Sequence, residues 1–235
     1  MSATVVVVTP ARFADAAARV IAGRIGDAIV TRHGCSIALC GGSTPIPVYQ
    51  RLAALPLDWA SIDVFFGDER AVPPEHADSN YRMAREALID RLQMAPRTLA
   101  RMPADRPDRD AAAADYDRLL PGQLDVLLLG VGSDGHTASL FPESPAIAET
   151  GRRVVAVASP RPPLRPQVAR MTITPLVLAS ARQIVVMVTG EEKASILARI
   201  LDGPDRPTEF PAQLARRATW VLDAPAAGQL QPREH

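Results

Sequence analysis

Short apolar runs alternate along the chain with longer amphipathic segments. Most of the runs are apolar without strict alternation, which is typical of strands covered on both faces of a sheet. In the first amphipathic segment, apolar residues recur at near-helical spacing and form one apolar face. The runs that predict strands are 4–8, 36–40, 62–66, 125–129, 154–157, 170–173, 184–188 and 219–222, and the segments that predict helices are 13–30, 45–55, 79–92 and 191–201.

This alternation predicts an α/β fold with a Rossmann-like, mostly parallel sheet and helices on both faces. Proline-rich stretches at 95–107, 160–166 and 204–211 are typical of loops, and none of them marks a domain boundary. We therefore expect a single α/β domain over 1–235, with 224–235 as a flexible tail. Ligands of such sheets bind beyond the carboxyl ends of the strands.

Composition narrows the range of partners. The 26 basic and 26 acidic residues cancel, so no overall field attracts nucleic acid or an anionic membrane. No run approaches the roughly 20 apolar residues of a spanning helix, and no basic region precedes the short apolar run at the N-terminus. Cys35 and Cys40 provide neither a disulfide framework nor a metal site. These features predict a cytoplasmic protein with reduced thiols and without a membrane or nucleic-acid partner.

A glycine turn follows the run 36–40. Gly41 and Gly42 permit a tight turn with exposed amides, Ser43 or Thr44 can cap the next helix, and Pro45 suits its first turn. Free N–H groups and hydroxyls at a helix N-terminus favour a bound phosphate. An ordinary capped turn has the same residues, so both interpretations stay open at this point.

Three consecutive charged residues follow the run 62–66. Asp68 can direct a sugar hydroxyl or a proton, and Arg70 can clamp an oxyanion. The alternative is a salt bridge at the entry of the next helix. Ser79 or Asn80 is expected to cap that helix.

The segment GVGSDGHTASLFP at 130–142 matches the dinucleotide fingerprint GxGxxG behind a strand. However, Pro142 comes too early for the long helix of that motif, and no acidic residue ends the next strand. The segment instead predicts a turn, including Gly132, whose amides approach a ligand and whose imidazole, His136, lies at a strand end. Asp134 can bias the tautomer or charge of His136, which suits a general base for water. A structural histidine is the alternative.

Arg170 begins a later strand, and Lys193 lies in the first turn of a later helix. A lysine there opposes the helix dipole, which favours a role facing an anion. It is also the single lysine beside 25 arginines. The sequence contains neither a cluster of metal ligands nor a Gly-x-Ser-x-Gly elbow, so we expect water activation without metal or cofactor.

Together the segments 40–45, 67–81, 130–142, 170–174 and 190–194 resemble the glucosamine-6-phosphate isomerase/6-phosphogluconolactonase family over about 5–221. The resemblance to its lactonases implies that Gly41, Gly42, Ser43, Thr44, Arg70, Gly132, Arg170 and Lys193 bind a phosphorylated sugar lactone. It implies that His136, supported by Asp68 and Asp134, activates water against C1 of 6-phospho-D-glucono-1,5-lactone. We expect a monomer or a small homo-oligomer.

Two alternatives to this function fit the residues less well. The deaminases of the family have an acidic residue at the position of Phe141 and a tyrosine at that of Arg70, so both positions favour the lactonases. A non-catalytic sugar-phosphate sensor would carry a separate DNA-binding segment, but here the first predicted strand begins at residue 4.

Overall fold

The computed structural model describes residues 3–232. Its strands are β1 (Thr4–Val8), β2 (Cys35–Leu39), β3 (Ile62–Phe66), β4 (Asp68–Arg70), β5 (Thr98–Leu99), β6 (Val126–Leu129), β7 (Val154–Val157), β8 (Arg170–Ile173), β9 (Gln183–Val188) and β10 (Thr219–Asp223). Its α-helices are α1 (Pro10–Arg32), α2 (Pro45–Ala53), α3 (Asn80–Ala87), α4 (Arg109–Leu119), α5 (Pro175–Ser180) and α6 (Ala194–Leu201). Short 3₁₀ turns complete the list: η1 (Trp59–Ser61), η2 (Ile89–Arg91), η3 (Pro145–Ala148), η4 (Glu191–Lys193) and η5 (Pro211–Ala215).

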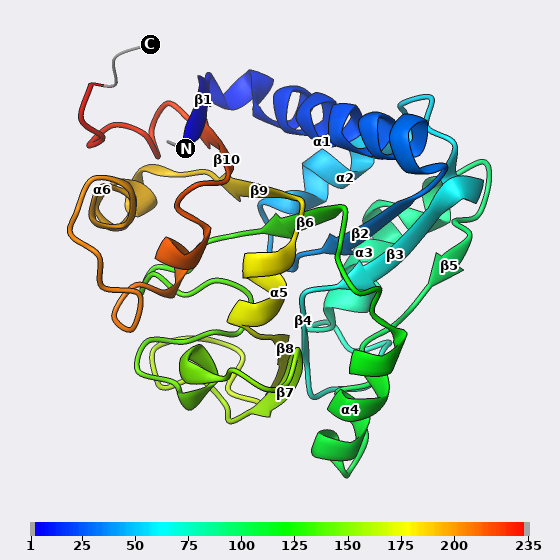
Figure 1. Ribbon diagram of the computed structural model, residues 1–235. Helices are drawn as coiled ribbons and strands as arrows, with labels where there is room; N and C mark the ends of the chain where they lie inside the picture. Colours follow the sequence, from blue (N-terminus) through cyan, green and yellow to red (C-terminus); the bar gives the residue numbers. More distant parts are fainter. Residues whose placement is uncertain (1–2, 233–235) are drawn as a thin grey trace.

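Seven strands form one parallel sheet in the order β1-β10-β9-β6-β2-β3-β5. Helices α1 and α2 cover one face, and α5 and α6 lie on the opposite side (Figure 1). The predicted α/β fold, with a mostly parallel sheet and helices on both faces, is confirmed. The connection after β2 leads to β3, whereas the chain after β6 returns to β9 on the other side. Between β2 and β6 the sheet therefore has a topological switch point, where open α/β sheets bind their ligands.

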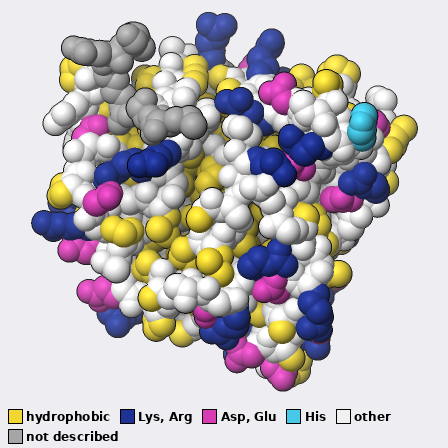
Figure 2. Space-filling model, in the orientation of Figure 1, with side chains coloured by type: hydrophobic (Ala, Val, Ile, Leu, Met, Phe, Trp, Pro, Cys, Tyr) yellow, Lys and Arg dark blue, Asp and Glu magenta, His cyan; other side chains and the backbone are white. Residues whose placement is uncertain are grey.

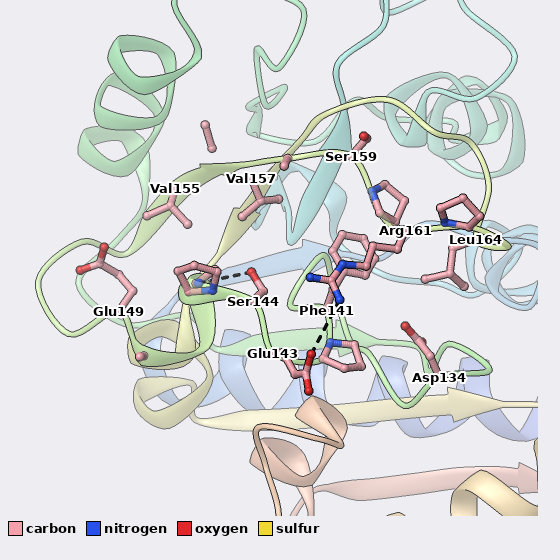
Figure 3. Close-up of a pocket in the computed structure, with 18 of the residues that line it drawn as sticks. Asp134, Phe141, Glu143, Ser144, Glu149, Val155, Val157, Ser159, Arg161 and Leu164 are labelled. Atoms are coloured by element: carbon pink, nitrogen blue, oxygen red, sulfur yellow. Dashed lines mark hydrogen bonds and ion pairs between the residues drawn. The ribbon is translucent and has the colours of Figure 1, made fainter.

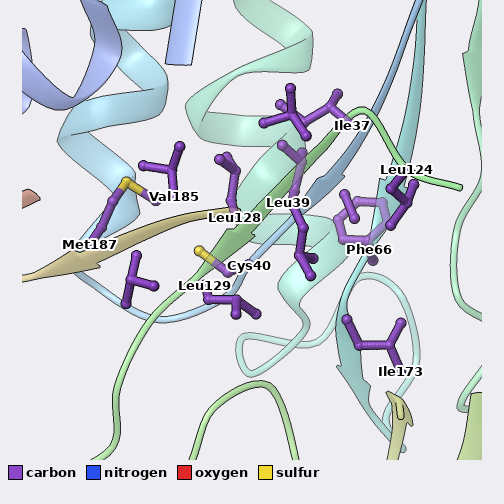
Figure 4. Packing of buried hydrophobic residues seen from close by; sticks show 14 of the residues in the cluster. Ile37, Leu39, Cys40, Phe66, Leu124, Leu128, Leu129, Ile173, Val185 and Met187 are labelled. Carbon is purple, nitrogen blue, oxygen red and sulfur yellow. The ribbon is translucent and has the colours of Figure 1, made fainter. Parts of the chain in front are cut away.

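The central strands are buried on both faces. Side chains of β2, β6 and β9, among them Ile37, Leu128 and Val185, pack into one apolar cluster (Figure 4). Two buried tyrosines fix the strand ends next to the switch point. The Tyr49 hydroxyl donates to the Cys40 carbonyl oxygen at 2.9 Å, and the Tyr116 hydroxyl accepts the Phe66 N–H at 2.8 Å. The segments that follow β2 and β3 thus start from rigid points.

Three strands lie outside the main sheet. β4, β8 and β7 form a separate antiparallel sheet below it in Figure 1. The runs 154–157 and 170–173 are strands as predicted, but their partners were not predictable, because an apolar run does not encode which strand it pairs with. β4 begins with charged residues and β5 has two residues, so neither has a strand pattern. α4 and α5 were also not expected from the sequence.

The C-terminal segment packs against the molecule as far as the structure describes it. Ala226 is completely buried, and its N–H donates to Asp223 Oδ1 at 2.9 Å. Residues 233–235 of the expected tail lie outside the described residues. Within the described chain no helix has the length and apolar character needed to cross a membrane. On the face in Figure 2, basic and acidic side chains are interspersed.

Candidate active site

A cavity of about 380 Å³ lies at the carboxyl edge of the main sheet. Its walls come from the segments that follow β2, β3, β6 and β9, which are neighbours in the sheet, and from β8 and the loop before it. The cavity therefore lies at the switch point, where the topology leads us to expect a ligand.

Ten of the eleven residues proposed from the sequence line this cavity. They are Gly41, Gly42, Ser43, Thr44, Asp68, Arg70, Gly132, His136, Arg170 and Lys193. The eleventh, Asp134, is not on its wall but holds the imidazole of His136. The structure thus brings together residues that are up to about 150 positions apart in the sequence.

His136 and Asp134 form a hydrogen-bonded pair. His136 Nδ1 lies 2.6 Å from Asp134 Oδ1, and the backbone N–H of His136 donates to the same oxygen at 3.1 Å. Burial raises the pKa of Asp134, but the hydrogen bond and charge of His136 outweigh burial and hold that pKa below its usual value. Because an ionised carboxylate can only accept, Nδ1 carries the proton. When the imidazole carries a single proton, Nε2 is then the nitrogen that can accept one.

Glycine at position 132 is required by this imidazole. A Cβ atom on Gly132 would lie 2.0 Å from His136 Nδ1 and 2.7 Å from Asp134 Oδ1. The Gly132 N–H also donates to the His136 carbonyl oxygen at 2.9 Å, which closes the turn. The backbone of Gly135 has φ of 86°, a conformation that favours glycine. Gly132 and Gly135 of the fingerprint-like motif therefore permit the turn that places the imidazole of His136 against Asp134.

Four cations without carboxylate partners line the cavity, namely Arg70, Arg165, Arg170 and Lys193. Among the described residues, none of them has an Asp or Glu oxygen within 4.0 Å. Arg70 and Arg170 face each other in the register of β4 and β8, where like charges repel. Burial, and then the charge of Arg70, lowers the pKa of Arg170. Burial also lowers the pKa of Lys193. An anion between them would relieve both the desolvation and the repulsion.

Both arginines also hold neighbouring backbone. Arg70 Nη1 donates to the Asp78 carbonyl oxygen at 2.6 Å, and its Nε is buried without a partner. The guanidinium of Arg170 donates to the Pro166 and Val168 carbonyl oxygens. Arg170 therefore also fixes the end of the loop that leads into β8.

Asp68 is a buried hydrogen-bond acceptor. The Ser139 hydroxyl donates to Asp68 Oδ2 at 2.6 Å, and Asn80 Nδ2 donates to Oδ1 at 3.1 Å. Among the described residues, neither Asp68 nor Arg70 forms a salt bridge at the start of α3, in contrast to the alternative interpretation. Instead, Glu69 accepts the N–H groups of Asn80 and Tyr81, each at 2.8 Å. The predicted cap of the helix is Ser79, whose hydroxyl accepts the Arg82 N–H.

Sequence reasoning missed several residues of the cavity wall, namely Thr189, Glu192, Arg165 and Phe141. The Thr189 hydroxyl is 3.2 Å from that of Thr44, which joins the segments after β9 and β2. Arg165 belongs to the proline-rich loop, where nothing in the sequence distinguishes it from the nearby Arg161. Among the described residues, no group of three or more His, Cys, Asp and Glu side chains is arranged to hold a metal ion.

Comparison with known proteins decides the family. The family model described as glucosamine-6-phosphate isomerases/6-phosphogluconolactonase matches residues 8–222. The chain belongs to this family. Relatives within the family include a protein named 6-phosphogluconolactonase from Synechocystis sp., 36% identical over 89% of this chain and 90% of that protein. Another protein of the same name, from Pseudomonas putida, is 40% identical over 81% of this chain and 79% of its own length.

Solved structures of the glucosamine-6-phosphate isomerase/6-phosphogluconolactonase family agree. The 6-phosphogluconolactonase of Trypanosoma brucei superimposes with a TM-score of 0.83, at 33% identity, over 98% of this chain and 99% of its own. A monomeric glucosamine-6-phosphate deaminase has the same TM-score of 0.83 at 21% identity, and covers 96% of this chain and 99% of its own. At that identity the likeness concerns the fold alone.

Proposed function

We propose that this protein hydrolyses 6-phospho-D-glucono-1,5-lactone to 6-phospho-D-gluconate. The observation that carries the proposal is that the imidazole held by Asp134 and four cations without carboxylate partners line the same small cavity. The relatives named 6-phosphogluconolactonase support it, since they match most of the chain.

In the proposed mechanism Asp134 holds Nδ1 of His136 protonated, and Nε2 takes a proton from water. The hydroxide oxygen forms a bond to C1 of the lactone, and the negative charge moves to the carbonyl oxygen. As the carbonyl re-forms, the bond between C1 and the ring oxygen breaks, and His136 returns its proton to that oxygen. Such general-base catalysis contributes roughly 10²–10⁴-fold. Because both oxygens of Asp68 already accept hydrogen bonds, we assign it to a substrate hydroxyl rather than to proton donation.

The phosphate of the substrate would bind between Arg70, Arg170 and Lys193, with the turn from Gly41 to Thr44 beside them. Charge-assisted hydrogen bonds to a phosphate are strong because both partners are ionised. Binding of this remote group can hold the ring in line with the base. No metal or cofactor takes part in the proposed steps.

We also propose that the protein works in the cytoplasm, as a monomer or a small homo-oligomer, without nucleic acid. All the proposed site residues belong to one chain, so a second copy is not needed to complete the site. Cys35 and Cys40 are buried free thiols, in keeping with a reducing compartment.

The test compares His136→Ala with the parent protein. The variant is expected to lose roughly 10²–10⁴-fold in lactone opening, corrected for spontaneous hydrolysis, and to keep its affinity for 6-phosphogluconate. His33→Asn is the matched control, because His33 ends α1 with φ of 60°, a conformation that asparagine tolerates. Near-parent turnover of His136→Ala would refute the mechanism. Release of ammonia from glucosamine 6-phosphate, without lactone opening, would refute the substrate.

A further inference from the structure

A second cavity, of about 810 Å³, is shown in Figure 3. It borders the cavity of about 380 Å³ described above, which is called the substrate cavity from here on. The two cavities share Phe141, Pro160 and Leu164 on their walls. Asp134 lines the larger cavity, whereas His136 lines the smaller one. The hydrogen bond between Asp134 and His136 therefore runs from one cavity to the other, and the shared residues form the partition beside it.

Phe141 is the member of the partition that touches the histidine. Its ring centroid lies 4.9 Å from that of His136, with the ring planes at 59°. This distance is within the range of favourable contacts between flat rings. The ring is partly buried and lines both cavities, whereas the imidazole lines only the smaller one.

The backbone around Phe141 is held in an unusual conformation. Ala138 and Glu143, on either side of it, have φ of 48° and 60°, in the left-handed region that side chains other than glycine rarely adopt. Hydrogen bonds from the Ser139 hydroxyl to Asp68 and from the Glu143 N–H to the Thr208 carbonyl oxygen fix the segment at both ends. Strain retained in this way is typical of functional positions.

We infer that Phe141 is a positioning residue: its ring fixes the imidazole plane of His136, so that Nδ1 stays directed at Asp134. This inference rests on the proposed function and deepens it. Without the ring, the imidazole can rotate about its Cβ–Cγ bond, and its Nδ1 can leave Asp134 Oδ1 for water. The tautomer with a free Nε2 is then no longer the single populated form.

The experiment compares Phe141→Ala with Val155→Ala. Val155 lines the larger cavity but not the smaller one, and no ring contact joins it to His136, so it controls for loss of apolar wall in the larger cavity. Phe141→Ala is expected to lower kcat about 10–100-fold, a part of the ~10²–10⁴-fold of general-base catalysis, with little change in KM. Val155→Ala should leave kcat within about threefold. Phe141→Tyr, which retains the ring, should restore most of kcat.

A second readout does not depend on turnover. Proton NMR of the parent protein should show the Nδ1 proton of His136 as a downfield signal that exchanges slowly, and Phe141→Ala should lose it to solvent exchange. If Phe141→Ala does not fold, Phe141→Leu keeps most of the volume without the ring and should show the same loss of signal with a several-fold lower kcat.

Equal effects of Phe141→Ala and Val155→Ala, or an effect on KM alone, would overturn the positioning role. A retained Nδ1 signal in Phe141→Ala or Phe141→Leu would overturn it as well. If the parent protein fails to open the lactone, the proposed function fails, yet the NMR comparison still decides whether Phe141 holds the imidazole.

Discussion

Lys193 combines three properties that concern its ammonium group. It lines the substrate cavity, it is partly buried, and no carboxylate lies within 4.0 Å among the described residues. Burial disfavours the charged form and lowers the pKa below the ordinary 10.5, although Glu192 and Asp134 act in the opposite direction. The residue therefore loses its proton at a lower pH than an exposed lysine does.

This shift predicts how product affinity depends on pH. If the phosphate of 6-phosphogluconate binds the ammonium form, as proposed, its affinity should fall as pH rises toward 10.5, at a lower pH than that at which an exposed lysine would titrate. In Lys193→Arg the guanidinium stays charged longer, and the alkaline loss should be smaller. Calorimetric titration over this pH range measures it without interference from spontaneous lactone opening. Equal alkaline losses in both proteins would contradict the role of Lys193.

Residues next to turn glycines were the predictable part of the site. Gly41, Gly132 and His136 follow strands that an apolar run reveals, so their place at the carboxyl edge could be inferred from local sequence. Arg165 and Thr189 could not be inferred in this way. They reach the cavity only because of the path that their loops take, and no local sequence pattern predicts that path. The contact between Phe141 and His136 depends on backbone conformation at Ala138 and Glu143, which the sequence does not reveal.

At the level of elements, Glu69 joins β4 to the start of α3. Its carboxylate accepts the N–H groups of Arg70, Asn80 and Tyr81 and the hydroxyl of Ser79, at 2.7–3.0 Å. It is almost completely buried. One side chain therefore holds the strand with Arg70 and the helix with Asn80 in a fixed relation, on which the position of Asp68 depends.

Replacing this carboxylate tests the junction. In Glu69→Gln the amide NH₂ would face donors that need an acceptor, which we expect to cost about 2–3 kcal/mol. For a chain of this size that corresponds to a fall in Tm of about 4–12 °C. Glu86→Gln, on the exposed face of the same helix, removes a surface ion pair with Arg82 and should change Tm by about 1 °C or less. Calorimetry of both variants checks the expectation, and equal Tm values would contradict it.

The elements show where sequence reasoning stops. Strands of the main sheet were predictable because burial on both faces leaves an apolar run. The small sheet was not, because Arg70 and Arg170 become neighbours only through the pairing of β4 with β8. α4 is rich in alanine and charged residues and has no marked apolar face, so it resembled the loops around it.

For the whole molecule, the described helices and strands pack onto one apolar cluster. Trp59, which precedes β3, and Trp220, in β10, lie toward opposite edges of the sheet, with β9, β6 and β2 between those strands. Both side chains are buried and should report unfolding by fluorescence.

If the chain is one cooperative domain, both tryptophans should report the same transition. We expect Trp59→Phe and Trp220→Phe, each with one remaining tryptophan, to give the same urea midpoint by fluorescence as by circular dichroism. Different midpoints by fluorescence and by circular dichroism in one variant would show that the region around its tryptophan unfolds independently of the rest. That result would contradict a single domain.

The scarcity of lysine in this chain also has a practical consequence. Reagents that select amines find one side-chain target, Lys193, besides the α-amino group. Its lowered pKa makes the neutral, nucleophilic amine more abundant than on an ordinary lysine. A fluorescent or cross-linking label can therefore be attached inside the substrate cavity without any engineered cysteine, and a bound phosphate ester should shield that one amine.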